Sequence, residues 1–467
     1  MPSSSKIAKK KVTKKGDSSR PVYRQEFGGI VEIIGGEFPA PLYQKFFGPF
    51  NGRKDLPSRP EFPACPEGVI EHTSAEYEPI TDGGIVELPD GRLLLAQGDG
   101  INESVNRATC RISKDGGATW SMATPLRWGM GVGGMIRLQS GALAIYGKKS
   151  KRDGNTYYFA RSKDDGRTWS TPVFIPAHCD FHLLFHSMIQ LTSGRLLVAG
   201  CCSSPDLHGF SEDLQRLTAA GWGWWRGVKL NAEGHRGPAY GICKTYFSDD
   251  EGRTWQGCKG GMFGWFNEQG IPDGTGGLTD VYEPTVAETK DGRLLMLARC
   301  RRGRLVQCYS LDAGQTWLSM QPSELSSSQS LPILVRIPQT GDLLCVWNQV
   351  SGEEIRRGRV RGRLSAAIST DSGQSWRNFK TIQSSEGMAD VDHIAPEFPI
   401  PGILRGNPGL GKLPDGYACF DYPNVDIVGD KVFLRYSRGW PVLCNNGKAE
   451  MTGEGVMRVY PLKWFYD

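Results

Sequence analysis

Several charged and phenolic residues lie at matching distances from the turns of predicted β-hairpins. Glu283 lies eight residues before Asp291, and Arg299 lies seven residues after Gly292. Residues at equal distances from a hairpin turn reach the same edge of the sheet, so Glu283 and Arg299 are expected to meet there. A guanidinium binds a carboxylate or a sulfate through two parallel hydrogen bonds, so this edge could hold an anionic ligand. A buried salt bridge between the two residues is the structural alternative.

The same counting brings a tyrosine and a second arginine to this edge. Tyr422 and Tyr436 lie seven residues on either side of Gly429. Arg361 opens a strand at the edge where the preceding strand ends near Asn348. A carboxylate, two arginines and a tyrosine are therefore expected around one mouth. The alternatives are a core tyrosine, and arginines on a solvated surface or in ion pairs between sheets.

Four further residues are candidates for the same mouth. Thr81 and Asp99 flank the turn at Asp90 in the way that Glu283 and Arg299 flank theirs. His182 could also line the mouth, but histidines without nearby carboxylates are more often structural than metal ligands. Trp224 could stack on a sugar ring or pack as part of a cap. We expect no metal and no cofactor.

These residues must be positioned by repeated sheets, because two sequence patterns recur along the chain. In the first pattern, Asp accepts backbone N–H groups of a tight turn, Gly allows a positive φ and Trp buries a large ring. The pattern S-x-D-x-G-x-[ST]-W occurs five times, at Ser113–Trp120, Ser162–Trp169, Ser248–Trp255, Ser310–Trp317 and Ser369–Trp376. The second pattern, a turn followed by an apolar strand, occurs six times. Repeats of roughly 50 residues predict an all-β fold, a six-bladed β-propeller with four antiparallel strands per blade.

The repeats also predict the domain organisation. Residues 1–20 are expected to form a disordered basic tail, which solubilises the chain or, as a minor alternative, tethers it to nucleic acid or membrane. Residues 21–467 are expected to form one propeller domain with an N-terminal extension. Insertions are expected near 203–240, with a short helix, and near 381–417. Residues 21–75 are expected to lie over the propeller or to contribute a closing strand through GGIVEIIGG, residues 28–36, with the C-terminal segment GVMRVYPLKWF as the candidate partner for ring closure.

Net charge, apolar stretches and cysteine spacing argue against nucleic-acid binding, a membrane span and a zinc site. The net charge is only +5, and no nucleic-acid partner is expected. No apolar stretch reaches membrane-spanning length, so no membrane span is expected. The 12 cysteines lack zinc-like spacing. Without a signal peptide in this sequence the protein is expected in the cytoplasm, or in the periplasm or secreted if the true start lies upstream.

The repeats resemble those of the bacterial neuraminidase, or Asp-box, repeat family, and the chain is similar to the sialidase superfamily from about residue 78 onward. That resemblance implies a tyrosine nucleophile on the last blade, an activating glutamate, three arginines that bind the substrate carboxylate and an aspartate acid/base. YEPTVAETKDGRLLMLAR resembles the family segment with the glutamate and second arginine, which implies these roles for Glu283 and Arg299. R-G-R-L from Arg361 resembles the segment of the third arginine, and DYPNV implies that Tyr422 is the nucleophile.

Two departures from the family pattern affect the site. Thr81 stands where the resemblance implies the first arginine. Asn102 stands where the acid/base aspartate is expected, with Asp99 and Glu103 nearby. We assign the acid/base to Asp99, and the alternatives are Glu103 or no acid at all.

The expected function is a retaining exo-glycosidase that removes a terminal acidic sugar, sialic acid or another anionic sugar, from a glycan or glycoconjugate. The alternatives are a hydrolase or lyase acting on uronic-acid or sulfated glycans, and a non-catalytic glycan-binding propeller. Fold alone does not decide between them.

Overall fold

The computed structural model shows a nearly all-β protein. It describes residues 22–26, 29–33, 60–73, 83–98, 108–128, 130–148, 157–177, 181–202, 221–225, 228–232, 242–262, 264–266, 277–279, 281–300, 303–328, 330–356, 359–396, 416–443 and 449–467. The predicted tail, residues 1–20, lies outside this part of the chain.

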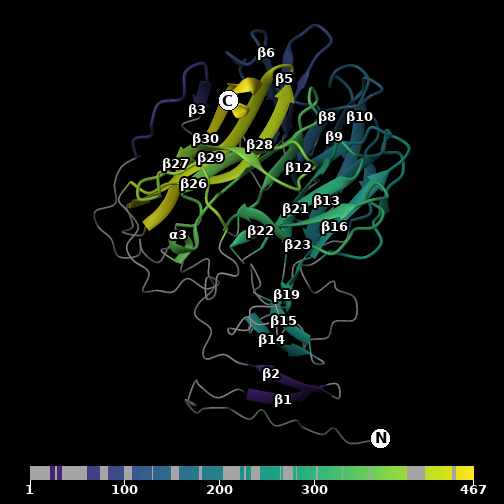
Figure 1. Ribbon diagram of the computed structural model, residues 1–467. Coiled ribbons are helices and arrows are strands. Elements are labelled where there is room, and N and C mark those ends of the chain that lie inside the picture. The colour runs from purple at the N-terminus through teal and green to yellow at the C-terminus, as the bar shows by residue number, and fades with distance from the viewer. Residues whose placement is uncertain are drawn as a thin grey trace, which may run out of the picture.

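Six four-stranded sheets form the blades of a propeller (Figure 1). Blades 1 to 3 are β4(Gly84–Glu87)–β5(Leu93–Gly98)–β6(Ala108–Ser113)–β7(Thr124–Pro125), β8(Gly134–Arg137)–β9(Leu143–Lys148)–β10(Tyr157–Ser162)–β11(Val173–Ile175) and β12(Phe181–Gln190)–β13(Leu196–Cys202)–β16(Ile242–Ser248)–β17(Gln256–Gly257). Blades 4 to 6 are β20(Tyr282–Glu288)–β21(Leu294–Arg299)–β22(Arg304–Ser310)–β23(Gln321–Ser326), β24(Ile333–Arg336)–β25(Leu343–Trp347)–β26(Arg363–Ser369)–β27(Arg377–Ser384) and β28(Cys419–Val428)–β29(Lys431–Leu443)–β30(Ala449–Pro461)–β3(Ile70–Thr73). The predicted six-bladed β-propeller is confirmed.

The first strand of each blade lines the centre of the ring. β4, β8, β12, β20, β24 and β28 contact one another in that order, and β28 contacts β4 to complete the circle. Each blade is antiparallel throughout. Residues at the start of these inner strands therefore gather around the axis although they are far apart in the sequence.

Blade 6 closes the ring by combining both ends of the described chain. β3 pairs with β30, with Ile70 opposite Val459 and His72 opposite Met457, and the two lie side by side in Figure 1. The C-terminal partner was predicted, but the N-terminal partner was not. Gly29–Ile33 of the GGIVEIIGG segment forms β2, which pairs with β1 (Val22–Glu26). The prediction was wrong because an apolar β-prone run does not specify which sheet edge it joins.

A seventh four-stranded sheet interrupts the blade order. It contains β14 (Gly221–Trp225), β15 (Val228–Ala232), β18 (Gly264–Phe266) and β19 (Gly277–Thr279), and it lies below the propeller in Figure 1. The insertion at 203–240 therefore contributes β14 and β15 to a sheet that also uses chain between blades 3 and 4. The short helix expected there lies outside the described residues.

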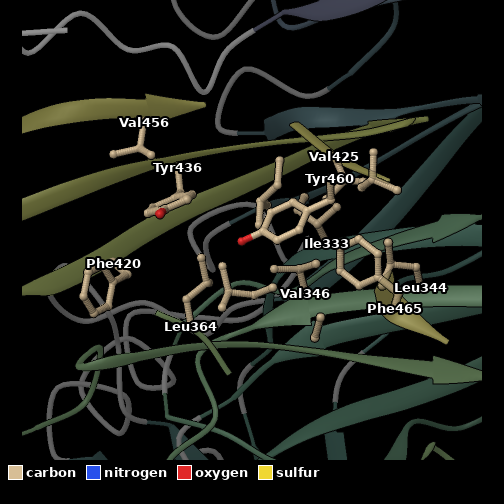
Figure 2. Close-up of a cluster of buried hydrophobic side chains, with 14 of the residues drawn as sticks. Ile333, Leu344, Val346, Leu364, Phe420, Val425, Tyr436, Val456, Tyr460 and Phe465 are labelled. Carbon is tan, nitrogen blue, oxygen red and sulfur yellow. The ribbon is translucent and has the colours of Figure 1, made fainter. Parts of the chain in front are cut away.

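Apolar side chains fill the seams between blades. Figure 2 shows the seam between blades 5 and 6, where Phe420, Tyr436 and Tyr460 pack against aliphatic residues of β24, β25 and β26. The Tyr436 side chain is fully buried in this core and donates a hydrogen bond of 2.6 Å to Gln383 Oε1. Tyr436 is therefore a core residue of the seam, although it lies as far from Gly429 as Tyr422 does.

The two described helices are short. They are α3 (Gly352–Arg356) and the 3₁₀ helix η3 (Leu462–Phe465). Within the described ranges, neither has the length or apolar character that crossing a membrane would require.

Candidate functional site

Glu283 and Tyr422 lie on inner strands of blades 4 and 6, each at an irregularity in the strand. The pairing of β20 with β21 shifts beside Glu283, and that of β28 with β29 shifts beside Tyr422. Both residues have a left-handed backbone, with φ of 49° and 52°. Pro284 and Pro423 follow directly, and a proline cannot donate to the strand ladder. Bulges of this kind re-aim a side chain, and left-handed residues other than glycine cluster at functional positions.

Glu283 meets Arg299 as the spacing predicted. Tyr282 is the residue opposite Arg299, and Arg299 Nε lies 2.8 Å from Glu283 Oε2. The Arg299 side chain is only 3% exposed and that of Glu283 is 14% exposed. Glu283 Oε2 accepts no aligned hydrogen bond from the described residues, so the contact is an ion pair without ideal geometry. Arg299 thus lies beneath Glu283, and the glutamate is the more accessible partner.

Arg361 lies between two residues of blade 6. Its Nη1 donates a hydrogen bond of 2.8 Å to Asp421 Oδ1, and its guanidinium carbon lies 5.5 Å from the centre of the Tyr422 ring. The backbone is fixed as well, because Phe420 N donates to the Arg361 carbonyl at 2.9 Å. Arg361 is 16% exposed at its side chain, so it is accessible where Arg299 is not.

The electrostatics of Arg361 show that the residues are close together. Burial alone would lower the pKa of the Arg361 guanidinium, but Asp421 and Tyr422, with a smaller contribution from Glu283, hold that pKa above its usual range. Side chains from blades 4, 5 and 6 therefore act on one another at one end of the ring. We call this end, with Glu283, Arg299, Arg361 and Tyr422, the mouth.

The side chains of the other four predicted site residues lie outside the described part of the chain. Thr81 and Asp99 lie outside the described residues. His182 lies on β12 and Trp224 on β14, but the described part of the chain does not include their side chains. No group of three His, Cys, Asp or Glu residues among the described ones could hold a metal ion.

Asp421 was not predicted as a site residue. Its position directly before Tyr422 could have indicated it, because a residue next to a candidate nucleophile in the chain also lies close to the site. Arg363, two residues after Arg361, has a structural role. Its side chain is fully buried and forms an ion pair with Glu354 at 2.9 Å.

Comparisons with known proteins agree with this architecture. Residues 135–434, more than half of the chain, match the family described as BNR repeat-like domain. The chain belongs to the BNR repeat-like family. The sialidase-like BNR propeller that the Asp-box pattern predicted is therefore confirmed at the level of family and fold.

Several solved structures are similar to this BNR propeller at low sequence identity. A protein of unknown function from Dyadobacter fermentans is 14% identical, with 84% of this chain and 99% of that chain covered and a TM-score of 0.47. A Trypanosoma rangeli sialidase in complex with the inhibitor DANA is 15% identical, with coverage of 80% and 54% and a TM-score of 0.43. An alpha-l-arabinofuranosidase from Fusarium graminearum is 13% identical, with coverage of 81% and 92% and a TM-score of 0.43.

One curated relative matches a shorter segment. Vacuolar protein sorting/targeting protein 10 of Debaryomyces hansenii is 30% identical over 156 residues, which are 31% of this chain and 9% of that protein. The chain thus spans about a tenth of the length of that relative.

Proposed function

We propose that this BNR propeller is a retaining exo-glycosidase of sialidase type that removes a terminal acidic sugar from a glycan. The observation that carries the proposal is the geometry around the accessible Arg361, whose Nη1 lies 2.8 Å from Asp421 Oδ1 and whose guanidinium lies 5.5 Å from the centre of the Tyr422 ring. A guanidinium beside a phenol on neighbouring blades supports a site for an anionic sugar with Tyr422 as the reacting group. The accessible guanidinium of Arg361 can bind the carboxylate of an anionic sugar, which a neutral sugar lacks.

Tyr422 is the proposed nucleophile. Its phenolic oxygen attacks the anomeric carbon while the bond to the leaving oxygen breaks, and Asp99 gives a proton to that oxygen. A phenol has a pKa of about 10 in water, so Glu283 must take its proton during the attack. Water then attacks the anomeric carbon with Asp99 as base, the bond from that carbon to the Tyr422 oxygen breaks, and Glu283 returns its proton to this oxygen. The sugar is released with its configuration retained.

A neutral nucleophile fits an anionic substrate. A carboxylate nucleophile would repel a sugar carboxylate, whereas a tyrosine does not. Asp421 on Arg361 illustrates how an external carboxylate would be held, since its Oδ1 lies 2.8 Å from Nη1. The substrate carboxylate is proposed to bind Arg361 in place of, or beside, Asp421.

A non-catalytic glycan-binding propeller is the second candidate. Two observations favour it: Thr81 stands where the resemblance implies an arginine, and both arginines at the mouth already have an acidic partner. Glycan binding requires no proton donor, so this candidate function does not depend on Asp99 as an acid. A hydrolase for uronic-acid or sulfated glycans would use the same mouth and differ in the sugar, and a lyase would differ also in breaking the glycosidic bond by elimination.

Hydrolysis of a panel of aryl glycosides, with a sialoside, a glucuronide and a neutral galactoside, tests the proposal. The wild type is expected to release the aryl group from an acidic glycoside, and Tyr422→Phe is expected to lower kcat by at least about a thousandfold, as loss of a nucleophile does. Tyr158→Phe is the matched control, because Tyr158 is a half-buried phenol of blade 2 that packs on Phe174.

The outcomes separate the candidates. Binding of an acidic glycoside without turnover in wild type and variant supports the glycan-binding propeller. Turnover that Tyr422→Phe leaves unchanged removes Tyr422 from the role of nucleophile. Turnover of the galactoside alone contradicts the acidic substrate.

A further inference from the structure

The Asp-box turns join neighbouring blades at the end of the ring opposite the mouth. In blade 4, Glu283 lies at one end of β20, and the Asp box follows the far end of β22, where Ser310 pairs with Leu294. In each box, the residue after the aspartate has a positive φ and approaches the preceding blade. These residues are Gly116, Asp165, Glu251, Ala313 and Ser372.

Four of these five positions are held directly by the preceding blade. The contacts are Lys431 Nζ to the Gly116 carbonyl at 2.8 Å, Arg161 to Glu251 at 3.0 Å, Arg195 to the Ala313 carbonyl at 3.0 Å and the Tyr309 hydroxyl to the Ser372 carbonyl at 3.0 Å. The donors differ, but each of these contacts joins two neighbouring blades at the end of the ring that carries the Asp boxes.

The seam between blades 1 and 2 differs. Asp165 pairs at 3.1 Å with Arg137, which belongs to its own blade. Blade 1 has Ile112 at the position of Arg161, directly before the serine of its Asp box, and an isoleucine cannot donate to Asp165. Arg137 does reach the Glu87 carbonyl at 2.9 Å, so the blades remain joined, but the equivalent of the Arg161–Glu251 contact is missing.

Glycine packing shows independently that this seam is looser. The box glycine packs so closely on the preceding blade in four boxes that an added methyl group would overlap a side chain: Phe433 at Gly117, Phe159 at Gly252, Leu197 at Gly314 and Leu295 at Gly373. At Gly166 the same methyl group would meet its nearest neighbour, Leu126, at 3.6 Å. That is an ordinary van der Waals distance, so the seam has room.

A cavity of about 540 Å³ occupies this seam. Its size lies within the range of small-molecule sites, about 300–1,000 Å³. Leu94, Ile112 and Leu126 line it with apolar surface, while guanidiniums come from Arg92, Arg127 and Arg167.

The arginines of this cavity differ in their partners. Arg92 pairs at 2.7 Å with Asp90, which is 53% exposed. Arg127 and Arg167 are exposed and form no ion pair with any described residue. Asp165 also lines the cavity, but Arg137 compensates its charge. The cavity therefore presents net positive charge beside apolar surface.

We propose that the seam between blades 1 and 2 binds a small ligand with an oxyanion group, a carboxylate, sulfate or phosphate, on a body with an apolar face. Arg127 and Arg167 hold the oxyanion, since guanidiniums bind such groups through paired hydrogen bonds. The C–H face of a sugar ring covers the half-buried Ile112 and the exposed Pro125 of the lining. An acidic mono- or disaccharide has this chemistry and fits the volume. The site is separate from the mouth and does not depend on the proposed glycosidase activity.

Calorimetric titration of the full chain with glucuronic acid, glucose and inorganic phosphate tests this site. Wild type is expected to bind glucuronic acid and to ignore glucose, and Arg167→Gln and Arg127→Gln are each expected to weaken that binding at least about tenfold, as loss of a charge-assisted hydrogen bond does. Arg253→Gln is the matched control. Arg253 occupies the position of Arg167 in the next Asp box and is equally exposed.

The variants also separate this site from the mouth. Binding that survives Arg361→Gln but not Arg167→Gln supports the seam site, whatever the activity of Tyr422→Phe. In a protein that carries Arg361→Gln, binding that survives the addition of Arg167→Gln and Arg127→Gln, or that is lost equally on addition of Arg253→Gln, overturns the proposal. Absence of binding to glucuronic acid and phosphate overturns it too. Phosphate binding without glucuronic acid binding retains the oxyanion site and rejects the sugar body.

Discussion

At the level of single residues, the mouth is close to charge balance. Glu283 compensates Arg299, and Asp421 compensates Arg361. An anionic ligand must therefore compete with an internal carboxylate for Arg361. This competition would weaken binding but also keep the guanidinium in place when the mouth is empty.

Replacing Asp421 by Asn measures that competition. Asp421→Asn is expected to tighten binding of an acidic sugar about tenfold, because a hydrogen bond between charged groups contributes about 1.5–3 kcal/mol and 1.4 kcal/mol corresponds to a factor of ten. The measurement is the Kd from calorimetry. Asp430→Asn, an exposed acid in the turn of the same β28–β29 hairpin, is expected to leave the Kd unchanged. Weaker binding in Asp421→Asn would mean that Asp421 orients Arg361 and does not compete with the ligand.

At the level of elements, the Asp boxes are small networks of hydrogen bonds around a carboxylate. Asp164 Oδ1 accepts from Ser162 Oγ at 2.7 Å and from Thr168 N at 2.8 Å, and Oδ2 accepts from Thr168 Oγ1. The hydrogen bond from the Thr168 hydroxyl, followed by those from Thr168 N–H and Ser162, lowers the pKa of Asp164 to about 2. Asp115 has the same pattern and a pKa of about 2.

Acid is therefore expected to destabilise the propeller over a defined range. A carboxylate with a lowered pKa stabilises the fold fully above its unfolded pKa of about 3.9, and the stabilisation is lost as pH falls toward the folded pKa. Tm is expected to be flat near pH 6 and to fall between about pH 4 and pH 2, the range between these two pKa values. Differential scanning calorimetry across this range is the measurement, and a Tm that stays constant down to pH 2 would contradict the expectation.

A single box can be tested in the same way. Asp164→Asn is expected to lower Tm at pH 7 and to reduce the fall in acid, because the amide loses the charge and one acceptor for the Thr168 hydroxyl. Asp390→Asn removes an exposed acid outside the boxes and is expected to change neither quantity. Equal Tm values for the two variants would show that the Asp164 network is not stabilising.

At the level of the whole molecule, a buried charge network fastens β3 into blade 6. Arg458 Nε donates to Glu71 Oε2 at 2.7 Å, and Arg438 Nη2 donates to Glu71 Oε1 at 3.3 Å. Arg438 also pairs with Glu454 at 2.5 Å and lies over the Phe62 ring at 4.1 Å. Burial opposes ionisation of Glu71, but its two arginines outweigh this effect and hold its pKa below the usual value.

Loss of this closure is expected to destabilise the ring. Glu71→Gln should lower the free energy of unfolding by roughly 3 kcal/mol, the low end for breaking a buried ion pair, because Glu71 remains partly exposed. Urea unfolding followed by tryptophan fluorescence measures it. Glu67→Gln, an exposed acid four residues earlier, is the control and should have no effect. A Glu71→Gln variant as stable as the control would mean that apolar packing alone closes blade 6.

The sequence by itself determined the blade count and the central pairing at the mouth. Five Asp boxes and six hairpins are local patterns, and equal distances from a turn fix which residues face each other, as with Glu283 and Arg299. Only the tertiary structure decided which N-terminal segment closes the ring, that Asp421 pairs with Arg361, and that one seam is looser than the four other seams with an Asp box. These depend on which blades become neighbours and on how individual side chains turn across a seam, and no spacing along the chain encodes either.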